Sequence, residues 1–122
     1  MTSVMIVEDD LDLQSLVEAI FSMDSRFLVA GLAESAEHAL EIARTTTPQI
    51  IVLDHGLAGA LTGIDAAPRL KEIVPHAGII LFTAHAELRT KVEEQPAVDA
   101  FLLKTESSRL LGLAQRLAGL PA

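Results

Sequence analysis

Three short, continuously apolar runs, at residues 4–7, 50–53 and 79–82, constrain the fold of this chain more than any other feature. Uninterrupted apolarity over so few residues predicts strands that are buried on both faces, as in the interior of a parallel sheet. Two weaker apolar runs, at 27–32 and 100–103, predict two further strands. The sequence therefore predicts five strands that are covered by other elements.

Helical patterns separate these runs. Apolar residues recur at i, i+3, i+4 and i+7, a spacing that places them on one face of a helix. The three stripes are Leu13, Leu16, Val17 and Ile20, then Ala36, Ala39, Leu40 and Ala43, and finally Leu110, Leu113, Ala114 and Leu117. A further helix is predicted over 64–74. The segment 86–95 offers only Leu88 and Val92, so we expect it to form the weakest helix.

The alternation of five strands with five helices predicts an α/β, doubly wound parallel sheet with right-handed crossovers. The 122 residues suit one domain, 1–122, and neither a repeat nor a linker interrupts them. Among the strand orders open to five strands, the flavodoxin-like order 2-1-3-4-5 reverses its winding between strands 1 and 3. Ligands bind at the carboxyl ends of the strands at such a reversal, which is where we look for chemistry.

Acidic residues follow both strands at this reversal. Glu8, Asp9 and Asp10 come directly after the first strand, and Asp54 ends the third. Carboxylates that converge require a cation or raise one another's pKa, and such hard oxygen ligands suit Mg²⁺. The alternative is that the triplet only caps the first helix and is otherwise solvated, and Asp10 is the expected cap in either case. A magnesium site and a capped, solvated turn both remain open at this point.

Thr83 and Lys104 end the fourth and fifth strands, at the same edge of the sheet as Asp54. A carboxylate, a metal ion, a hydroxyl and an ammonium around one point can stabilise a phosphoryl group during transfer, with Asp54 as the nucleophile. Taken singly, Thr83 is an ordinary strand-end hydroxyl and Lys104 an ordinary edge lysine. Only their joint placement, one group at each strand end, favours phosphoryl chemistry.

Composition excludes several classes of function. Nine Lys and Arg against seventeen Asp and Glu give a net charge of −8, the wrong sign for direct binding to nucleic acid. Without cysteine, the chain can form neither a disulfide nor a thiolate zinc site, which suits a reducing cytoplasm. No basic leader precedes the first strand, and no apolar run approaches the roughly 18 residues of a membrane span. We therefore expect a cytoplasmic protein that binds no membrane.

Four segments in order resemble the receiver domains of two-component response regulators, and the resemblance extends over essentially the whole chain. They are MIVEDD at 5–10, IVLD at 51–54, LFTA at 81–84 and FLLK at 101–104. Each segment is weak evidence alone, whereas all four at these separations are highly specific. The resemblance implies the flavodoxin-like fold and a signalling function without enzymatic activity.

The resemblance also implies roles for individual residues. Asp54 would accept a phosphoryl group from a sensor histidine kinase or a histidine phosphotransfer protein. Mg²⁺ would be bound by four groups: the carboxylates of Asp9 and Asp54, Glu8 through a water molecule, and the backbone carbonyl of Gly56. Thr83 and Lys104 would bind the phosphoryl oxygens. The surface of helix 4, strand 5 and helix 5 would then switch toward a downstream target, an output domain or a second copy of the chain.

The sequence departs from the family pattern at three places. Ala58 stands near the position of a usual proline, and Gly63 arrives about one residue late, so the loop 56–62 should follow an unusual path. Thr105 replaces the proline that usually follows the strand 5 lysine, so the usual cis peptide should be absent. Phe101 occupies the place of a coupling aromatic that is often Tyr, and it lacks the hydroxyl.

Three other functions are compatible with parts of the sequence. A small magnesium-dependent phosphohydrolase would need a second Asp two residues after Asp54, where Gly56 stands. A flavodoxin would share the fold, but three acidic residues would repel a flavin phosphate and the chain has no Trp or Tyr to stack on the ring. A receiver that no longer accepts phosphate is a further alternative. Because the chain ends shortly after the last helix, both a stand-alone regulator and a receiver cut from a longer protein remain open.

Overall fold

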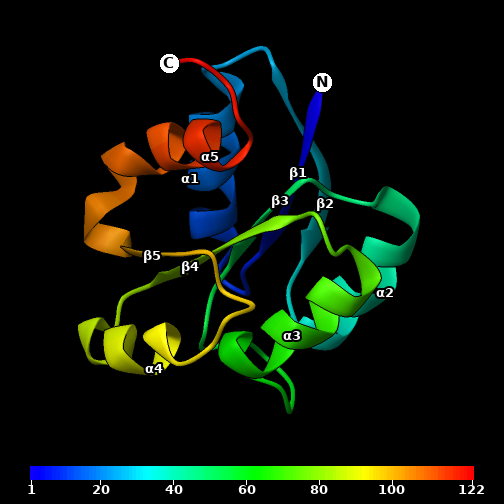
Figure 1. Cartoon of the computed structure of the whole chain (residues 1–122), viewed down its shortest axis with the longest axis vertical. Helices are drawn as coiled ribbons and strands as arrows, with labels where there is room; N and C mark the ends of the chain where they lie inside the picture. The colour runs from blue at the N-terminus through cyan, green and yellow to red at the C-terminus, as the bar shows by residue number, and fades with distance from the viewer.

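A computed structural model describes residues 1–122 and contains one sheet of five parallel strands (Figure 1). The strands are β1 (Thr2–Val7), β2 (Phe27–Ala33), β3 (Ile50–Leu53), β4 (Gly78–Thr83) and β5 (Ala100–Leu103). Each apolar run singled out in the sequence lies within one of them. Their order is β2-β1-β3-β4-β5, which confirms the predicted flavodoxin-like order.

Helices cover both faces of the sheet, as the doubly wound fold requires (Figure 1). They are α1 (Leu11–Ser22), α2 (Ala36–Thr46), α3 (Gly63–Ile73), α4 (Arg89–Glu93) and α5 (Leu110–Leu117), with 3₁₀ turns η1 (Ala86–Leu88) before α4 and η2 (Lys104–Arg109) before α5. Side chains of α1 and α5 share one core cluster, and those of α2, α3 and α4 share the other. None of these helices combines the length and the apolarity that crossing a membrane requires.

Strand β3 shows why its sequence is apolar without interruption. Ile50 and Val52 point into the core cluster beneath α1 and α5, while Ile51 and Leu53 point into the cluster beneath α2, α3 and α4. All four side chains are buried, so neither face of the strand has room for a polar residue. The weaker run at 27–32 belongs to β2, which lies at the edge of the sheet and leaves alternate residues exposed.

The predicted stripe of α1 was partly wrong. Val17 and Ile20 are buried as expected, but the side chain of Leu16 is 44% exposed. The helix instead turns Phe21 into the core, where its ring meets that of Phe27 edge to face at 5.2 Å between centroids. An aromatic pair of this geometry adds packing energy beyond the buried area, which favours this rotation of the helix.

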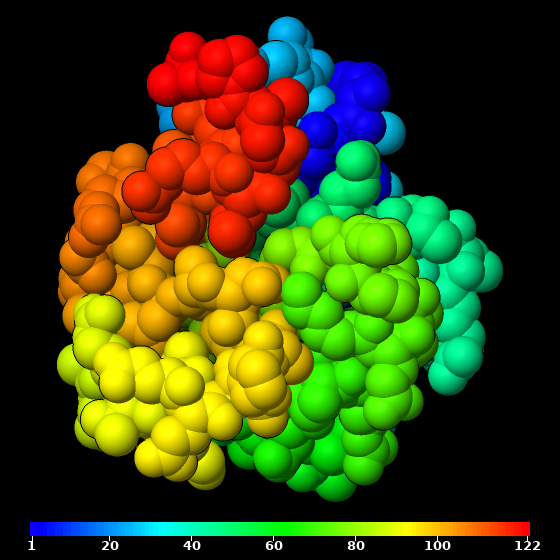
Figure 2. All heavy atoms as spheres, in the orientation of Figure 1, coloured from blue at the N-terminus to red at the C-terminus, as the bar shows by residue number.

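Helix α4 is the weakest of the five, as its sequence predicted. It has five residues, no side chain caps its first turn, and only Val92 is buried. Figure 2 shows the residues of α4 (yellow), the chain that follows it (orange) and α5 (red) adjoining on one face of the molecule. Few buried apolar contacts hold α4 against the sheet, so it is a segment that can move at low cost.

Gly63, the first residue of α3, allows that helix to approach the end of β3 closely. Its N–H donates to the carbonyl of His55 at 3.0 Å. A Cβ at this position would overlap the carbonyl oxygen of Asp54 and would lie 3.0 Å from the Cα of His55. Because backbone atoms cannot yield as a flexible side chain can, only glycine fits here, and the end of β3 and the start of α3 are held together.

We predict that Gly63→Ala lowers the free energy of unfolding by about 2 kcal/mol or more, the cost of forcing atoms into a closely packed site. Gly112→Ala is the matched control, because Gly112 is exposed within α5 and a Cβ there would meet nothing within 4 Å. It should raise stability by up to ~1 kcal/mol, since alanine is the better helix former. Urea denaturation of both variants measures the difference, and equal stabilities would contradict the proposed close approach.

Candidate functional site

Three carboxylates converge at the carboxyl edge of the sheet. Glu8 and Asp9 follow β1, Asp54 follows β3, and the last paired residues of these neighbouring strands are Val7 and Leu53. One carboxylate oxygen from each of the three acidic residues lies within 4.8 Å of the others. The predicted convergence is confirmed, whereas the roles of these residues stay predictions.

The first turn of α1 explains why only two members of the acidic triplet face this site. Asp10 is the N-cap, and its Oδ1 accepts hydrogen bonds from the N–H groups of Asp12 at 2.9 Å and Leu13 at 3.2 Å. The predicted cap is thereby confirmed. The buried Gln14 side chain donates to the carbonyl oxygen of Glu8 at 2.7 Å and fixes the backbone beside the site. Sequence reasoning missed Gln14, although a glutamine within an apolar helix stripe was a visible signal.

Lys104 reaches the carboxylates from β5, two strands away from β3 in the sheet. Its Nζ lies 2.9 Å from Oε1 of Glu8 and 3.2 Å from Oδ2 of Asp54. The side chains of Glu8, Asp54 and Lys104 are 5%, 9% and 18% exposed. A single ammonium therefore bridges two nearly buried carboxylates that would otherwise repel each other.

Burial and the contacts between Lys104 and the carboxylates have opposite effects on the pKa values of Glu8 and Lys104. Burial raises the pKa of Glu8, and the nearby negative charge of Asp54 adds to that effect, although the hydrogen bond from Lys104 works against it. Burial alone would lower the pKa of Lys104, but the hydrogen bond to Glu8 and the charges of Asp54 and Glu8 outweigh it and raise the pKa. Lys104 is thus held in its charged form, and Glu8 is the carboxylate whose charge is costly.

Asp54 is held by two different donors. Its Oδ1 accepts a hydrogen bond from the backbone N–H of His55 at 2.8 Å, while Oδ2 accepts one from Lys104. Thr83, at the end of the neighbouring strand β4, is fully buried. The hydroxyl oxygen of Thr83 accepts a hydrogen bond from the N–H of His85 at 3.2 Å, and its own hydrogen is not donated to any protein group.

Gly56 lies in the loop that leaves the site, and a Cβ there would meet nothing within 4 Å, so the position is open. Every peptide bond in the chain is trans, including the one before Thr105, as the missing proline predicted. Phe101 is half-buried in β5, and the guanidinium of Arg89 lies over its ring at 4.6 Å from the centroid. This contact was not predicted from the sequence.

The donor set fits a hard divalent cation. The cluster offers carboxylate oxygens from Glu8, Asp9 and Asp54, with no sulfur ligand, and Mg²⁺ prefers oxygen ligands while keeping several water molecules. Asp9 is exposed at the mouth of the cluster, which leaves space for such water. These residues can therefore hold Mg²⁺ without any rearrangement of the strands that carry them.

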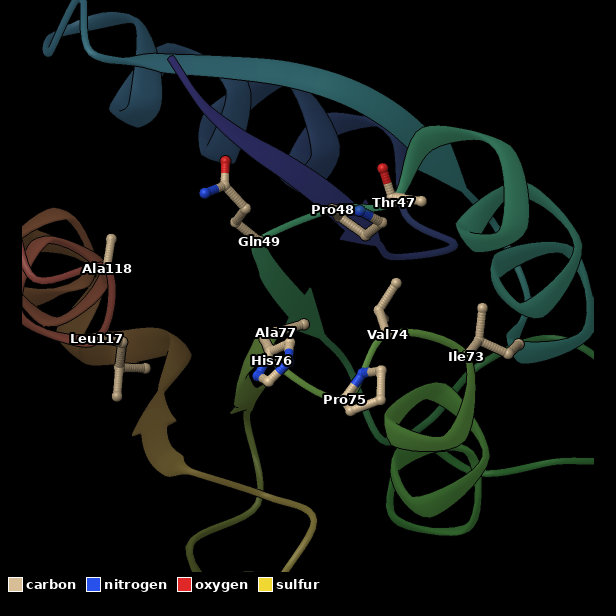
Figure 3. A pocket seen from close by; sticks show the side chains of 10 residues that line it. All are labelled: Thr47, Pro48, Gln49, Ile73, Val74, Pro75, His76, Ala77, Leu117 and Ala118. Atoms are coloured by element: carbon tan, nitrogen blue, oxygen red, sulfur yellow. The ribbon is translucent and has the colours of Figure 1, made fainter.

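A partly apolar cavity lies elsewhere. It measures about 380 Å³ and is lined by residues that precede β3 and β4 and by the end of α5 (Figure 3). Those residues lie at the amino edge of the sheet, opposite the carboxylates. Such a cavity is ordinarily the first candidate for a binding site. We assign the functional site to the carboxyl edge because the converging ionisable groups lie there.

Comparison with known proteins identifies the family of this chain. The family model described as response regulator receiver domain matches residues 4–115. A solved LuxR-family two-component response regulator from Aurantimonas sp. SI85-9A1 is 26% identical, with a TM-score of 0.85 over 100% of this chain and 89% of that one. The chain belongs to the response regulator receiver domain family.

Curated relatives are longer than this chain. The positive alginate biosynthesis regulatory protein of Pseudomonas aeruginosa is 30% identical over 120 residues, which cover 98% of this chain and 48% of that protein. A protein-glutamate methylesterase/protein-glutamine glutaminase of Paramagnetospirillum magneticum is 40% identical over 67 residues, 55% of this chain and 19% of that protein. The chain thus spans about half or less of the length of these relatives.

We predict that Lys104→Met lowers the free energy of unfolding at neutral pH by about 1–3 kcal/mol, because Glu8 and Asp54 lose their shared counter-charge. The folded-state pKa of Glu8, already raised, should rise further. A folded state that binds the proton more tightly loses stability as pH rises through that pKa, so the deficit should shrink on acidification.

Urea denaturation between pH 5 and pH 8 measures this dependence. Arg116→Met is the matched control, because it removes one exposed cation that forms no ion pair with a carboxylate and should leave the pH dependence unchanged. A deficit for Lys104→Met that stayed constant across this range would contradict the coupling of Lys104 to Glu8.

Proposed function

We propose that this receiver accepts a phosphoryl group on Asp54 and transmits the change through its surface. The observation that carries the proposal is the Lys104 ammonium bridging Asp54 and Glu8 in a cluster of three carboxylates. This cluster lies where the winding of the sheet reverses, the usual place for ligands in such folds. As a single receiver domain over 1–122, the chain acts as a signalling module and not as an enzyme with its own substrate turnover.

The proposed donor is a phosphohistidine of a sensor histidine kinase or a histidine phosphotransfer protein. A carboxylate oxygen of Asp54 forms a bond to phosphorus while the P–N bond of the phosphohistidine breaks. The electron pair of that bond stays on the ring nitrogen, and the ring leaves as neutral imidazole because its other nitrogen carries the proton. The His55 N–H and Lys104 each donate to one oxygen of Asp54 and so orient the nucleophile.

Lys104 and Thr83 would stabilise the transferred group. The Lys104 ammonium is already within 3.2 Å of Asp54, so it can move from Glu8 and Asp54 to a phosphoryl oxygen with little displacement. The unused hydrogen of the Thr83 hydroxyl can be donated to a second phosphoryl oxygen. Because Thr83 is fully buried, reaching that oxygen must disturb the end of β4.

Mg²⁺ is the proposed cofactor, held by the carboxylates of Asp9 and Asp54, by Glu8 through water, and by the carbonyl of Gly56. When bound, it offsets negative charge on the phosphoryl oxygens and on the carboxylates around them. A solved response regulator of Thermotoga maritima, TrrA, which is 22% identical over 96% of this chain, was determined in complex with Mg²⁺ and BeF, and this supports the proposal by likeness of fold. The phosphohydrolase alternative lacks its acid-base group, since Gly56 has no side chain.

The proposed site of action is the cytoplasm, where histidine kinases present their phosphorylated histidines, and the absence of cysteine agrees with that compartment. The net charge of −8 argues against nucleic-acid binding by this domain. The downstream partner is therefore a protein surface, an output domain of a longer regulator, or a second copy of the chain.

We predict that the wild-type chain, incubated with Mg²⁺ and a small phosphodonor, gains one phosphoryl group that is stable in acid and labile in base. Asp54→Asn should gain none, because its amide is no nucleophile. Asp9→Ala should lose most of its Mg²⁺ affinity, since a direct ligand is gone. Intact-mass measurement and calorimetric Mg²⁺ titration provide the readouts. A phosphoryl group on Asp54→Asn at another residue would reject the assignment.

The surface that changes is proposed to be that of α4, β5 and α5. Helix α4 is short and has only Val92 buried, and the Arg89 guanidinium on the Phe101 ring links it to β5. A cation–π contact of this exposed kind contributes about 0.5–1 kcal/mol, so a modest rearrangement can break it. Recruitment of Thr83 toward a phosphoryl group would open space beside Phe101 on the neighbouring strand.

We predict that beryllofluoride with Mg²⁺ changes amide hydrogen exchange chiefly within residues 86–109, the stretch that includes Leu88, Lys91, Val92, Phe101 and Arg109. The physical reason is that the least stable element responds first to a shift of a few kcal/mol. Asp54→Asn with the same additions is the control and should show no change. Exchange differences confined to α1 and α2 would place the switch on another face.

A further inference from the structure

The loop between β3 and α3 follows a path that the family resemblance did not predict. It leaves the site at Gly56, and Ala58 forms an isolated parallel bridge with Ser35. It then turns back at Gly59, whose φ of +94° lies in the left-handed region that favours glycine. The loop is thereby drawn against the start of α2.

Glu37, in the first turn of α2, provides the polar contact at this point. Its Oε2 accepts a hydrogen bond from the backbone N–H of Ala60 at 3.2 Å, across 23 positions of sequence. A Cβ at Gly59 would lie only 2.7 Å from the Oε1 of Glu37. Glycine at 59 is therefore favoured by its backbone conformation, and the flexible carboxylate of Glu37 packs close beside it.

Electrostatics agree with this geometry. Its own backbone N–H, the N–H groups of Ala60 and Leu61, and the positive charge of Arg69 lower the pKa of the Glu37 carboxyl, against a smaller opposing effect of burial. The side chain is exposed, so water competes for it. A carboxylate that nevertheless accepts N–H groups from a separate loop acts as a directional anchor more than as a source of bulk stability.

The loop needs such an anchor because two glycines, Gly56 and Gly59, leave its backbone with more freedom than other residues allow. Leu57 and Leu61 pack against the core, and they fix the loop in the direction of the sheet. The contact with Glu37 constrains the stretch between these two leucines. That stretch adjoins Gly56, so its restraint limits the freedom of the backbone at Gly56.

We propose that Glu37 is a positioning residue for the magnesium site: by holding Ala60, it restrains the loop that begins at Gly56, whose carbonyl is one of the proposed ligands. This inference rests on the proposed function of the site, because it assigns Glu37 an effect on the affinity for Mg²⁺. Glu37 itself touches neither the metal nor the phosphoryl group.

Calorimetric titration with Mg²⁺ tests the proposal on the full chain, which has no Trp or Tyr for a fluorescence measurement. Glu37→Ala should weaken the Mg²⁺ affinity about 3- to 10-fold, at or below the low end of the loss seen when a group that directly orients a ligand is removed. Glu37→Gln retains an acceptor oxygen and should stay within about twofold of the wild type. Amide exchange should increase in residues 57–61 of Glu37→Ala.

Glu41→Ala is the matched control, because it removes one exposed carboxylate from the same helix without touching the loop. It should leave Mg²⁺ affinity unchanged. Equal losses for Glu37→Ala and Glu41→Ala would overturn the proposal in favour of general electrostatics. An unchanged affinity for Glu37→Ala, or a Gln variant as damaged as the Ala variant, would overturn it as well.

A phosphorylation assay distinguishes a failure of this inference from a failure of the proposed function on which it rests. At saturating Mg²⁺, the phosphorylation rate of Glu37→Ala should approach that of the wild type, because the substitution affects only the affinity for Mg²⁺. A rate that stayed low at saturating Mg²⁺ would overturn the positioning role. If the wild type bound Mg²⁺ but accepted no phosphoryl group, the proposed function would fail while the effect of Glu37 on Mg²⁺ affinity remained measurable.

Discussion

The site depends on one lysine that bridges two carboxylates at the edge of a parallel sheet. Parallel strands present their carboxyl ends together, and here that edge carries Glu8, Asp9 and Asp54 within 4.8 Å of one another. Burying like charges is costly unless a counter-charge is supplied. The Lys104 ammonium supplies it, and because it is shared between Glu8 and Asp54 it is also free to be drawn toward a new anion. One ammonium among three carboxylates leaves the cluster with excess negative charge, which agrees with the proposed binding of a metal ion.

Packing around the sheet holds Asp54 in a defined position. β3 is buried on both faces, so Asp54 leaves the core from a strand that has no freedom to shift. α3 is packed so closely against the end of that strand that no side chain fits at Gly63. The backbone N–H of His55 then fixes one oxygen of Asp54. Rigidity in the nucleophile therefore derives from packing that extends well beyond the charged residues.

Sequence reasoning recovered what depends on local pattern and chain order. The apolar run at 50–53 predicted a doubly covered strand, the acidic residue after it predicted a group at the carboxyl edge, and Asp10 predicted a cap. It failed where the outcome depends on a surface that only the fold creates. Leu16 is exposed and Phe21 is buried, and the packing of α1 against the sheet decides which of the two faces the core. The contact of Glu37 with the 56–62 loop joins residues 23 positions apart, and no periodicity in the sequence encodes it.

The chain before Thr83 is firmly packed, whereas the chain after Thr83 is held by few buried contacts. β4 delivers Thr83 fully buried beside the carboxylates, yet the chain that follows enters η1 and α4, which bury only Val92. A ligand shifts a conformational equilibrium only by the difference in its binding free energy between the two states, and for a small anion that difference is a few kcal/mol. A free-energy difference of that size would not displace a well-packed helix. Helix α4, held by the burial of Val92 and by the Arg89 guanidinium on the Phe101 ring, has few contacts to oppose it. The poor apolar stripe of this helix is therefore what the proposed switch needs at this surface.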